Sequence, residues 1–174
     1  MRVLFIAEHG DMPSIRLRLT NLFDRYRAAG IEPTLLTTRS DLGERLRLIR
    51  EAGRHDVVVL HRTTGLSPLQ LTLLRRANPR IIFDFDDALM FRDQKYGQPL
   101  RVRTFAKFVR TIESCSAVVA GNEFLGCFAR VFIHVAVNRC WWRSPTAHLS
   151  GENANRFHCT AQIGCVVKER RQIK

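Results

Sequence analysis

Short apolar runs and longer amphipathic segments alternate along the first 120 residues of the chain. Five runs, at residues 3–7, 34–38, 56–60, 81–85 and 117–120, have the length and apolar character of buried strands. Between them, apolar residues recur at intervals of three and four, which is the spacing of one helix face. Strands that alternate with helices predict a Rossmann-like α/β fold, in which a doubly wound, mostly parallel sheet is built with right-handed crossovers.

Capping residues mark the ends of the expected helices. Ser14 and the pair Ser67-Pro68 are helix start signals, whereas Gly30 and the pair Asn78-Pro79 are stop signals. These signals and the apolar spacing predict helices over residues 15–30, 40–53, 67–78, 100–112 and 124–128. Residues 131–137 are a candidate sixth strand.

The regular pattern ends near Asn138. Residues 124–151 contain no Asp or Glu, and neither a helical nor a strand period continues beyond Asn138. We therefore assign residues 1–137 to one Rossmann-like domain and residues 138–174 to an irregular, poorly structured basic tail.

Polar residues follow four of the five strands. Because the carboxyl ends of parallel strands meet at one edge of a sheet, these residues are expected to line a ligand cleft. The candidate ligand-binding residues are His9 and Gly10 after the first strand, His61 and Arg62 after the third, Asp84, Asp86 and Asp87 after the fourth, and Gly121 and Asn122 after the fifth.

Three carboxylates at the end of the run 81–85 admit three interpretations. Asp84 and Asp86 are two residues apart, so on a strand they point the same way and suit a magnesium ion. Alternatively, one of two close carboxylates has a raised pKa and acts as a general base toward a hydroxyl. In the third interpretation, Asp84 only accepts hydrogen bonds and Asp87 only caps a turn. The residues themselves leave all three open.

The chain is strongly basic, with a net charge of +12 over 174 residues. Such a charge suits a nucleic acid, an anionic membrane or a phosphorylated ligand. No nucleic-acid-binding motif accompanies the charge, so we expect no nucleic-acid partner. The patterns GxGxxG and GxxxxGK[ST] are absent, and the cysteines and histidines do not have the spacing of a zinc site. We therefore expect no cofactor and no metal ion bound by this chain.

Cysteine usage and hydropathy predict the compartment. The five cysteines are an odd number without a CxxC pair, which is typical of reduced thiols in the cytosol. No run has the character of a signal peptide or the length of a transmembrane helix. We expect a cytoplasmic protein, with at most a peripheral contact at the inner face of a membrane.

Three segments, in order, resemble the N-terminal half of GT-B glycosyltransferases of the family 4 type. Residues 83–88 read Phe-Asp-Phe-Asp-Asp-Ala and match one branch of that family. Residues 120–125 read Ala-Gly-Asn-Glu-Phe-Leu and look like the branch's A-G-N-x-[FY]-L segment, and residues 60–62 are similar to its third strand ending. The similarity covers residues 1–130.

The resemblance implies the acceptor-binding half of a two-domain enzyme of cell-envelope polysaccharide synthesis. Such an enzyme transfers a sugar from a nucleotide sugar to a hydroxyl acceptor, either a glycan or a lipid-linked sugar. Asp86 takes the place of a histidine that is frequent in the family, which makes it the candidate catalytic residue facing the acceptor. The nucleotide-sugar donor is expected to bind a second Rossmann domain of the full-length enzyme.

The chain departs from the family pattern after residue 130. The family continues with a segment that contains a proline and an acid, whereas residues 134–140 here read His-Val-Ala-Val-Asn-Arg-Cys. The resemblance therefore implies a truncated or frameshifted enzyme that is inactive alone.

Two other classes of protein stay open. One is a non-catalytic binding module that docks on an anionic membrane or a partner protein through its Arg-rich first helix and the basic segment 100–112. The other, less favoured, is a phosphoacceptor or phosphatase-like domain that uses Asp84 and Asp86.

Overall fold

The computed structural model describes residues 1–8, 13–38, 42–91, 102–132 and 140–142. Its centre is a parallel sheet of six strands in the order β2-β1-β3-β4-β5-β6. The strands are β1 (Arg2–Ala7), β2 (Glu32–Thr37), β3 (Val57–His61), β4 (Ile81–Phe85), β5 (Ala117–Ala120) and β6 (Cys140–Trp142). The predicted Rossmann-like α/β fold is confirmed, with strand order reversing between β1 and β3 as in other doubly wound sheets.

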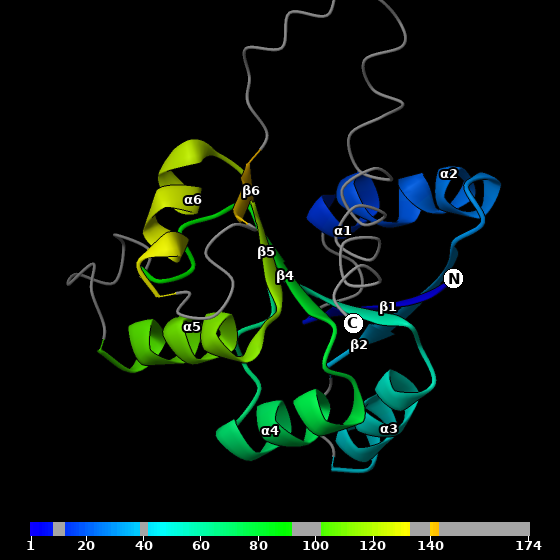
Figure 1. Cartoon of the computed structure of the whole chain (residues 1–174), viewed down its shortest axis with the longest axis horizontal. Helices are drawn as coiled ribbons and strands as arrows, with labels where there is room; N and C mark the ends of the chain where they lie inside the picture. The colour runs from blue at the N-terminus through cyan, green and yellow to red at the C-terminus, as the bar shows by residue number, and fades with distance from the viewer. Residues whose placement is uncertain (9–12, 39–41, 92–101, 133–139, 143–174) are drawn as a thin grey trace, which may run out of the picture.

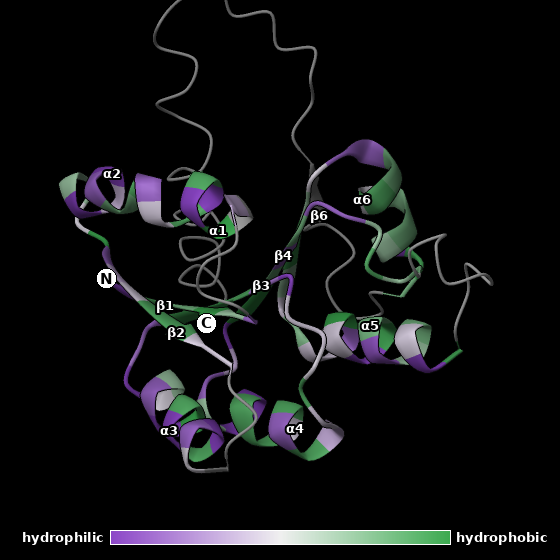
Figure 2. Cartoon of the chain, turned by 180° about the vertical axis from the view of Figure 1, so that it is seen from behind, coloured by the Kyte–Doolittle hydropathy of each residue, from purple (hydrophilic) through white to green (hydrophobic). Residues whose placement is uncertain are grey.

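The central strands are buried on both faces because helices cover both sides of the sheet. Every residue of β3 and β4 is buried, which explains why these strands appear in the sequence as continuous rather than alternating apolar runs. In Figure 2 the strands are coloured mainly hydrophobic, whereas the helices carry hydrophilic and hydrophobic residues in alternation.

The helices form one layer on each face of the sheet (Figure 1). One layer contains α1 (Pro13–Arg18), a 3-10 turn at Thr20–Leu22 and α2 (Phe23–Ala28), which pack on Phe5 and Val59. The other contains α3 (Leu42–Gly53), α4 (Pro68–Ala77), α5 (Val102–Ser114) and α6 (Glu123–Arg130), which pack on Leu4, Leu60 and Phe83. Phe83, Phe85 and Phe108 form a stacked and edge-on aromatic group in this second layer.

The first predicted helix, over residues 15–30, is broken in the structure. α1 ends at Arg18 and α2 begins at Phe23, with the 3-10 turn between them. Thr20 and Asn21 in the turn are weak helix formers, and the Thr20 hydroxyl donates a hydrogen bond to the Arg16 carbonyl at 3.4 Å, a contact that bends helices. Apolar spacing indicated the buried face correctly but not the interruption.

The start signal at Ser67 and Pro68 is confirmed in detail. The Ser67 side chain accepts the Gln70 backbone N–H, and the Gln70 side chain accepts the Ser67 backbone N–H, with Pro68 in the first turn. This reciprocal capping box satisfies two backbone donors that α4 would otherwise leave unpaired. The start of α4 is thus determined by four consecutive residues.

The chain after α6 differs from the predicted sixth strand at residues 131–137. Val131 and Phe132 form the turn that ends α6, with the Phe132 N–H donating to the Ala129 carbonyl, and residues 133–139 lie outside the described residues. The sixth strand is Cys140–Trp142, which pairs with β5. These three residues belong to the sheet although the sequence pattern assigned them to the tail; residues 143–174 lie outside the described part.

None of the helices in the described ranges has both the length and the apolar character needed to cross a bilayer.

Candidate functional site

The strand register brings most of the predicted ligand-binding residues to one edge of the sheet. His61 pairs with Asp84 across β3 and β4, and Ala120, which precedes Gly121, pairs with Phe85. Seven of the nine predicted residues, all except His9 and Gly10, therefore lie at or just after the carboxyl ends of adjacent strands. His9 and Gly10 lie outside the described residues.

Asp84 is the buried centre of this cluster. One of its carboxylate oxygens accepts a hydrogen bond from His61 Nδ1 at 2.7 Å, and the other accepts one from Arg18 Nη2 at 3.2 Å. His61 and Asp84 are 1% and 8% exposed, so both polar groups depend on each other for hydrogen bonding. A carboxylate that is buried is stable in its charged form only with such partners.

Arg18 was not among the site residues that the sequence analysis predicted. Its guanidinium bridges two carboxylates, with Nη2 3.2 Å from Asp84 and Nη1 2.7 Å from Asp86. A signal was present: Arg18 is three residues after Ile15 and next to Leu19, both of which are buried. A cation on the apolar face of a helix indicates a buried anion opposite to it.

Asp86 carries a depressed pKa. Burial alone raises the pKa of Asp86, but the hydrogen bond and charge of Arg18, with the charges of Arg62 and His61, hold it below its ordinary value. This direction is opposite to the one that the general-base interpretation requires for Asp86. Asp84 and Asp86 do point toward one cation, as the magnesium interpretation required, but that cation is the Arg18 guanidinium.

Because the pKa of Asp86 is depressed in the folded state, the free energy of unfolding depends on pH. The folded-state pKa is below the unfolded value of about 3.8, so the stabilisation is present above that value and is lost as the pH falls through the folded-state pKa. The free energy of unfolding of the unmodified chain should fall between about pH 6 and about pH 3, and this fall should be smaller in Asp86→Asn. Urea unfolding at both pH values measures the difference. Asp24→Asn, at a carboxylate that is 95% exposed, is the matched control. An unchanged pH dependence in Asp86→Asn would contradict the assignment.

Arg62 has an unusual backbone conformation at the edge of the cluster. Its φ of 54° lies in the left-handed region, which is uncommon for a residue other than glycine. Its guanidinium bonds to Asp87 and lies 3.6 Å from Asp86, and its backbone N–H donates to the Asp84 carbonyl. The strained residue thus connects the end of β3 to the loop after β4.

Two buried polar atoms of the cluster have no hydrogen-bond partner among the described residues. These atoms are Nε2 of His61 and Oδ1 of Asp86. Buried polar atoms are nearly always paired in folded proteins, so an unpaired one beside a sheet edge is a feature of a ligand site. Because Nδ1 of His61 donates to Asp84, Nε2 of the neutral ring is an acceptor, as is the Asp86 oxygen, so a hydroxyl group is able to donate to either atom.

Gly121 allows the loops after β4 and β5 to touch. A Cβ atom at Gly121 would lie 2.7 Å from the Asp86 Cα and 2.9 Å from the Asp86 Cβ, closer than atoms approach without displacement. The Gly121 N–H also donates to the Phe85 carbonyl at 2.8 Å. The glycine is therefore a positioning residue for Asp86.

Asn122 has a structural role that the sequence analysis did not give it. Its side-chain oxygen accepts the Leu125 backbone N–H at 2.9 Å and caps α6, while the residue itself is exposed. We expect Asn122→Ala to lower the unfolding free energy by about 0.5–2 kcal/mol, because it removes the cap. Asn122→Asp keeps the acceptor and should retain most of the stability in urea unfolding. Equal losses in both variants would show that the cap contributes nothing.

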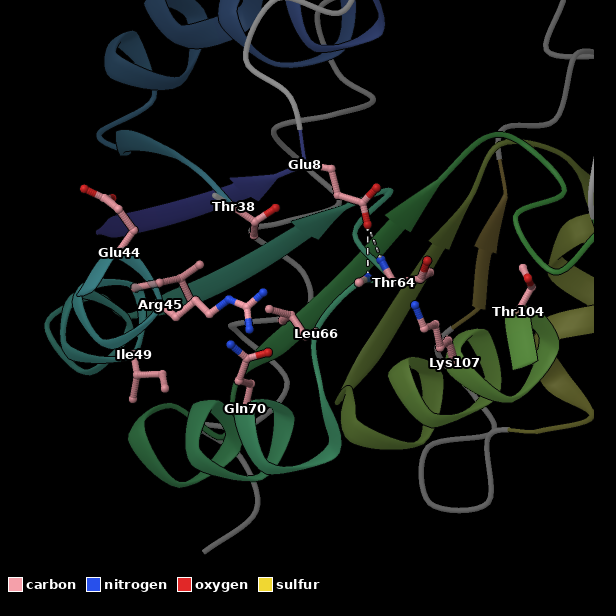
Figure 3. A pocket seen from close by; sticks show the side chains of 12 residues that line it. Glu8, Thr38, Glu44, Arg45, Ile49, Thr64, Leu66, Gln70, Thr104 and Lys107 are labelled. Carbon is pink, nitrogen blue, oxygen red and sulfur yellow. Dashed lines mark hydrogen bonds between the residues drawn. The ribbon is translucent and has the colours of Figure 1, made fainter. Parts of the chain in front are cut away.

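A cavity of about 430 Å³ opens near the same edge but under the other face of the sheet (Figure 3). The Asp84 cluster faces α1, whereas this cavity is lined by α3, α4, α5 and the segments that follow β1, β2 and β3. The lining residues are Glu8, Thr38, Glu44, Arg45, Leu48, Ile49, Thr64, Gly65, Leu66, Gln70, Thr104 and Lys107. None of them was predicted from the sequence, because they come from six separate segments.

Within the described ranges, no group of three or more His, Cys, Asp or Glu side chains is placed to hold a metal ion. No known protein-family model matches the chain, and no curated protein is significantly similar to it.

Proposed function

We propose that the chain is the acceptor-binding half of a glycosyltransferase, which holds a hydroxyl-bearing acceptor while a nucleotide-sugar donor is held elsewhere. The observation that carries the proposal is the linked cluster at the carboxyl edge of β3, β4 and β5. Segments that resemble glycosyltransferase motifs in the sequence supply its members, and the ligands of doubly wound sheets bind at this edge. The proposal rests on that resemblance together with the geometry.

The proposed roles follow from exposure and charge. Asp87 is 59% exposed and has lone pairs to accept hydrogen bonds from acceptor hydroxyls. Asp86 has a depressed pKa, so it accepts a hydrogen bond from the reacting hydroxyl rather than removing its proton. Arg18 and Arg62 hold Asp86 in place, and Gly121 leaves room for it.

Amide chemical-shift mapping with a panel of methyl glycosides and disaccharides tests acceptor binding. Titration into the ¹⁵N-labelled chain should shift the amide signals of Arg62, Asp87 and Gly121. Asp87→Asn and Arg62→Gln should weaken that binding, and Asp24→Asn, far from the cluster on α2, should leave it unchanged. Shifts confined to other regions, or none with any sugar, would overturn the proposal.

We expect the 174-residue chain alone to transfer no sugar. Its described residues form a single sheet with its helices, and a glycosyltransferase needs preorganised charges at the leaving diphosphate as well as an acceptor site. Incubation with radiolabelled nucleotide sugars and a lipid extract should give product at the level of the protein-free blank. Product above that level would contradict the proposal that this chain holds only the acceptor while the donor is held elsewhere.

The DNA downstream of the codon for Arg130 gives an independent test. Translation in all three frames should show a proline-and-acid segment and a second Rossmann domain in another frame. If no frame encodes such a domain, the proposal of a glycosyltransferase half loses its support.

The alternative of a membrane-docking module gains no support from the arrangement of the basic helices. α1 and α2 pack on one face of the sheet and α5 packs on the other, so their charges do not form one continuous surface (Figure 1). The Arg18 guanidinium is also held between Asp84 and Asp86. Membrane docking through both segments at once would require a different arrangement.

A further inference from the structure

We propose that the cavity between α3, α4 and α5 is a second ligand site and that it binds a small sugar carrying a single phosphate. The cavity lies on the face of the sheet opposite to Arg18 and its carboxylates, and no residue of the proposed acceptor cluster lines it. Its volume of about 430 Å³ is within the usual range for small-molecule sites. The inference is therefore independent of the proposed glycosyltransferase function.

Two cations without an anionic partner face this cavity. Arg45 comes from α3 and Lys107 from α5, and neither has a carboxylate within 4 Å among the described residues. The Glu44 carboxylate beside them pairs instead with Arg47, at 3.5 Å. In Figure 3, Arg45 and Lys107 enter the cavity from separate helices. Two half-buried cations on separate elements match a phosphate, which accepts hydrogen bonds from several directions.

The rest of the lining suits the hydroxyl groups of a sugar. Oε1 of Glu8 accepts the backbone N–H groups of Thr64 and Gly65, at 3.1 and 3.0 Å, which fixes the carboxylate at the cavity wall. The second oxygen of Glu8 has no hydrogen bond to another described residue and is an acceptor for a hydroxyl. Thr38 and Gln70 add a hydroxyl and an amide on the neighbouring walls (Figure 3).

The charge balance favours one phosphate over a longer polyanion. Arg45 and Lys107 supply two positive charges, and Glu8 and Glu44 supply two negative charges, but the Glu44 carboxylate pairs with Arg47 outside the lining, which leaves the Glu8 carboxylate to face the two cations. The two cations neutralise the charge of a ligand with a single phosphate. The groups of such a ligand that lie beside Glu8 are hydroxyl groups and not a second phosphate. A nucleic acid or a diphosphate would bring negative charge against the Glu8 carboxylate.

Isothermal titration calorimetry with three probes tests the site. The probes are glucose 6-phosphate, inorganic phosphate and glucose, titrated into the full chain. Glucose 6-phosphate should bind more tightly than either of the others, and Arg45→Gln and Lys107→Gln should each weaken it by about tenfold or more, because each removes a charged hydrogen bond. Arg50→Gln on α3 and Arg110→Gln on α5 are exposed, lie outside the cavity and should bind as the unmodified chain does.

Amide shifts locate the bound probe without relying on variants. Glucose 6-phosphate should shift the Thr64 and Gly65 amide signals of the unmodified chain, because these N–H groups bond to the Glu8 carboxylate. Failure of these signals to shift would overturn the proposal even if a variant failed to fold. Equal affinity for inorganic phosphate and glucose 6-phosphate would overturn the sugar assignment, and equal losses in the Arg50→Gln control would overturn the site itself.

Discussion

Asp84→Ala should lower the free energy of unfolding by about 3–5 kcal/mol, because it removes one partner of a buried charged network. The substitution leaves the His61 ring, which is 1% exposed, without the Asp84 carboxylate that it bonds to, and removes one of the two carboxylates that the Arg18 guanidinium bridges. Urea unfolding at neutral pH, followed by far-UV circular dichroism, measures the change. The substitution should lower the urea concentration at the unfolding midpoint and leave the m-value, the dependence of the unfolding free energy on urea concentration, unchanged.

Asp24→Ala is the matched control for this prediction. Asp24 also pairs with an arginine, Arg27 at 2.7 Å, but its side chain is 95% exposed. An exposed pair of this kind contributes about 0–1 kcal/mol because water screens it. Losses of similar size in Asp84→Ala and Asp24→Ala would show that burial adds nothing to the Asp84 network.

Gly121→Ala is expected to have the second large effect, a loss of about 1–3 kcal/mol with displacement of Asp86. The added methyl group would meet the Asp86 backbone, at 2.7 Å from its Cα, and a backbone atom directly after a strand that is paired in the sheet cannot move as a side-chain end does. The unfolding midpoint reports the loss. The amide signals of Asp86 and Asp87 should move as well, because the loop after β4 must shift.

Gly53→Ala separates this steric effect from the general effect of replacing glycine. At Gly53, the last residue of α3, the nearest atom to an added Cβ is 3.7 Å away, which is ordinary contact. Alanine there should leave stability unchanged or raise it slightly, by up to about 1 kcal/mol. If Gly121→Ala is tolerated equally well, the contact between the two loops is looser than the structure indicates.

Local residue patterns were sufficient for most of the sheet. The strands at 81–85 and 117–120 coincide with β4 and β5, and the helix start at Ser67 coincides with the cap of α4. These features depend on residues that are adjacent or one turn apart, so they are visible in a single sequence. Convergence of His61, Asp84 and Gly121 was also predictable, since parallel strands end at one edge.

Features that depend on long-range contacts were not predicted. The bridge from Arg18 to Asp84 and Asp86 requires knowledge of what lies opposite Arg18. The pKa of Asp86 is a further case, because two close carboxylates predict a raised pKa until the intervening guanidinium is known. Arg18, Arg62 and His61, which come from other segments of the chain, lower the pKa of Asp86 instead. In contrast, the break between α1 and α2 and the cap at Asn122 involve contacts only three or four residues apart, which the sequence analysis overlooked.

By itself, the sequence determined the fold class, the order of its elements and the edge at which polar residues collect, because periodicity and capping are local properties. Only the tertiary structure decided that Arg18 neutralises the acid cluster and that a second cavity lies on the opposite face. Those arrangements join α1 to β4, and α3 to α5, across about 65 and 60 residues of chain. Contacts between such distant segments are selected by packing against the sheet, which no local pattern encodes.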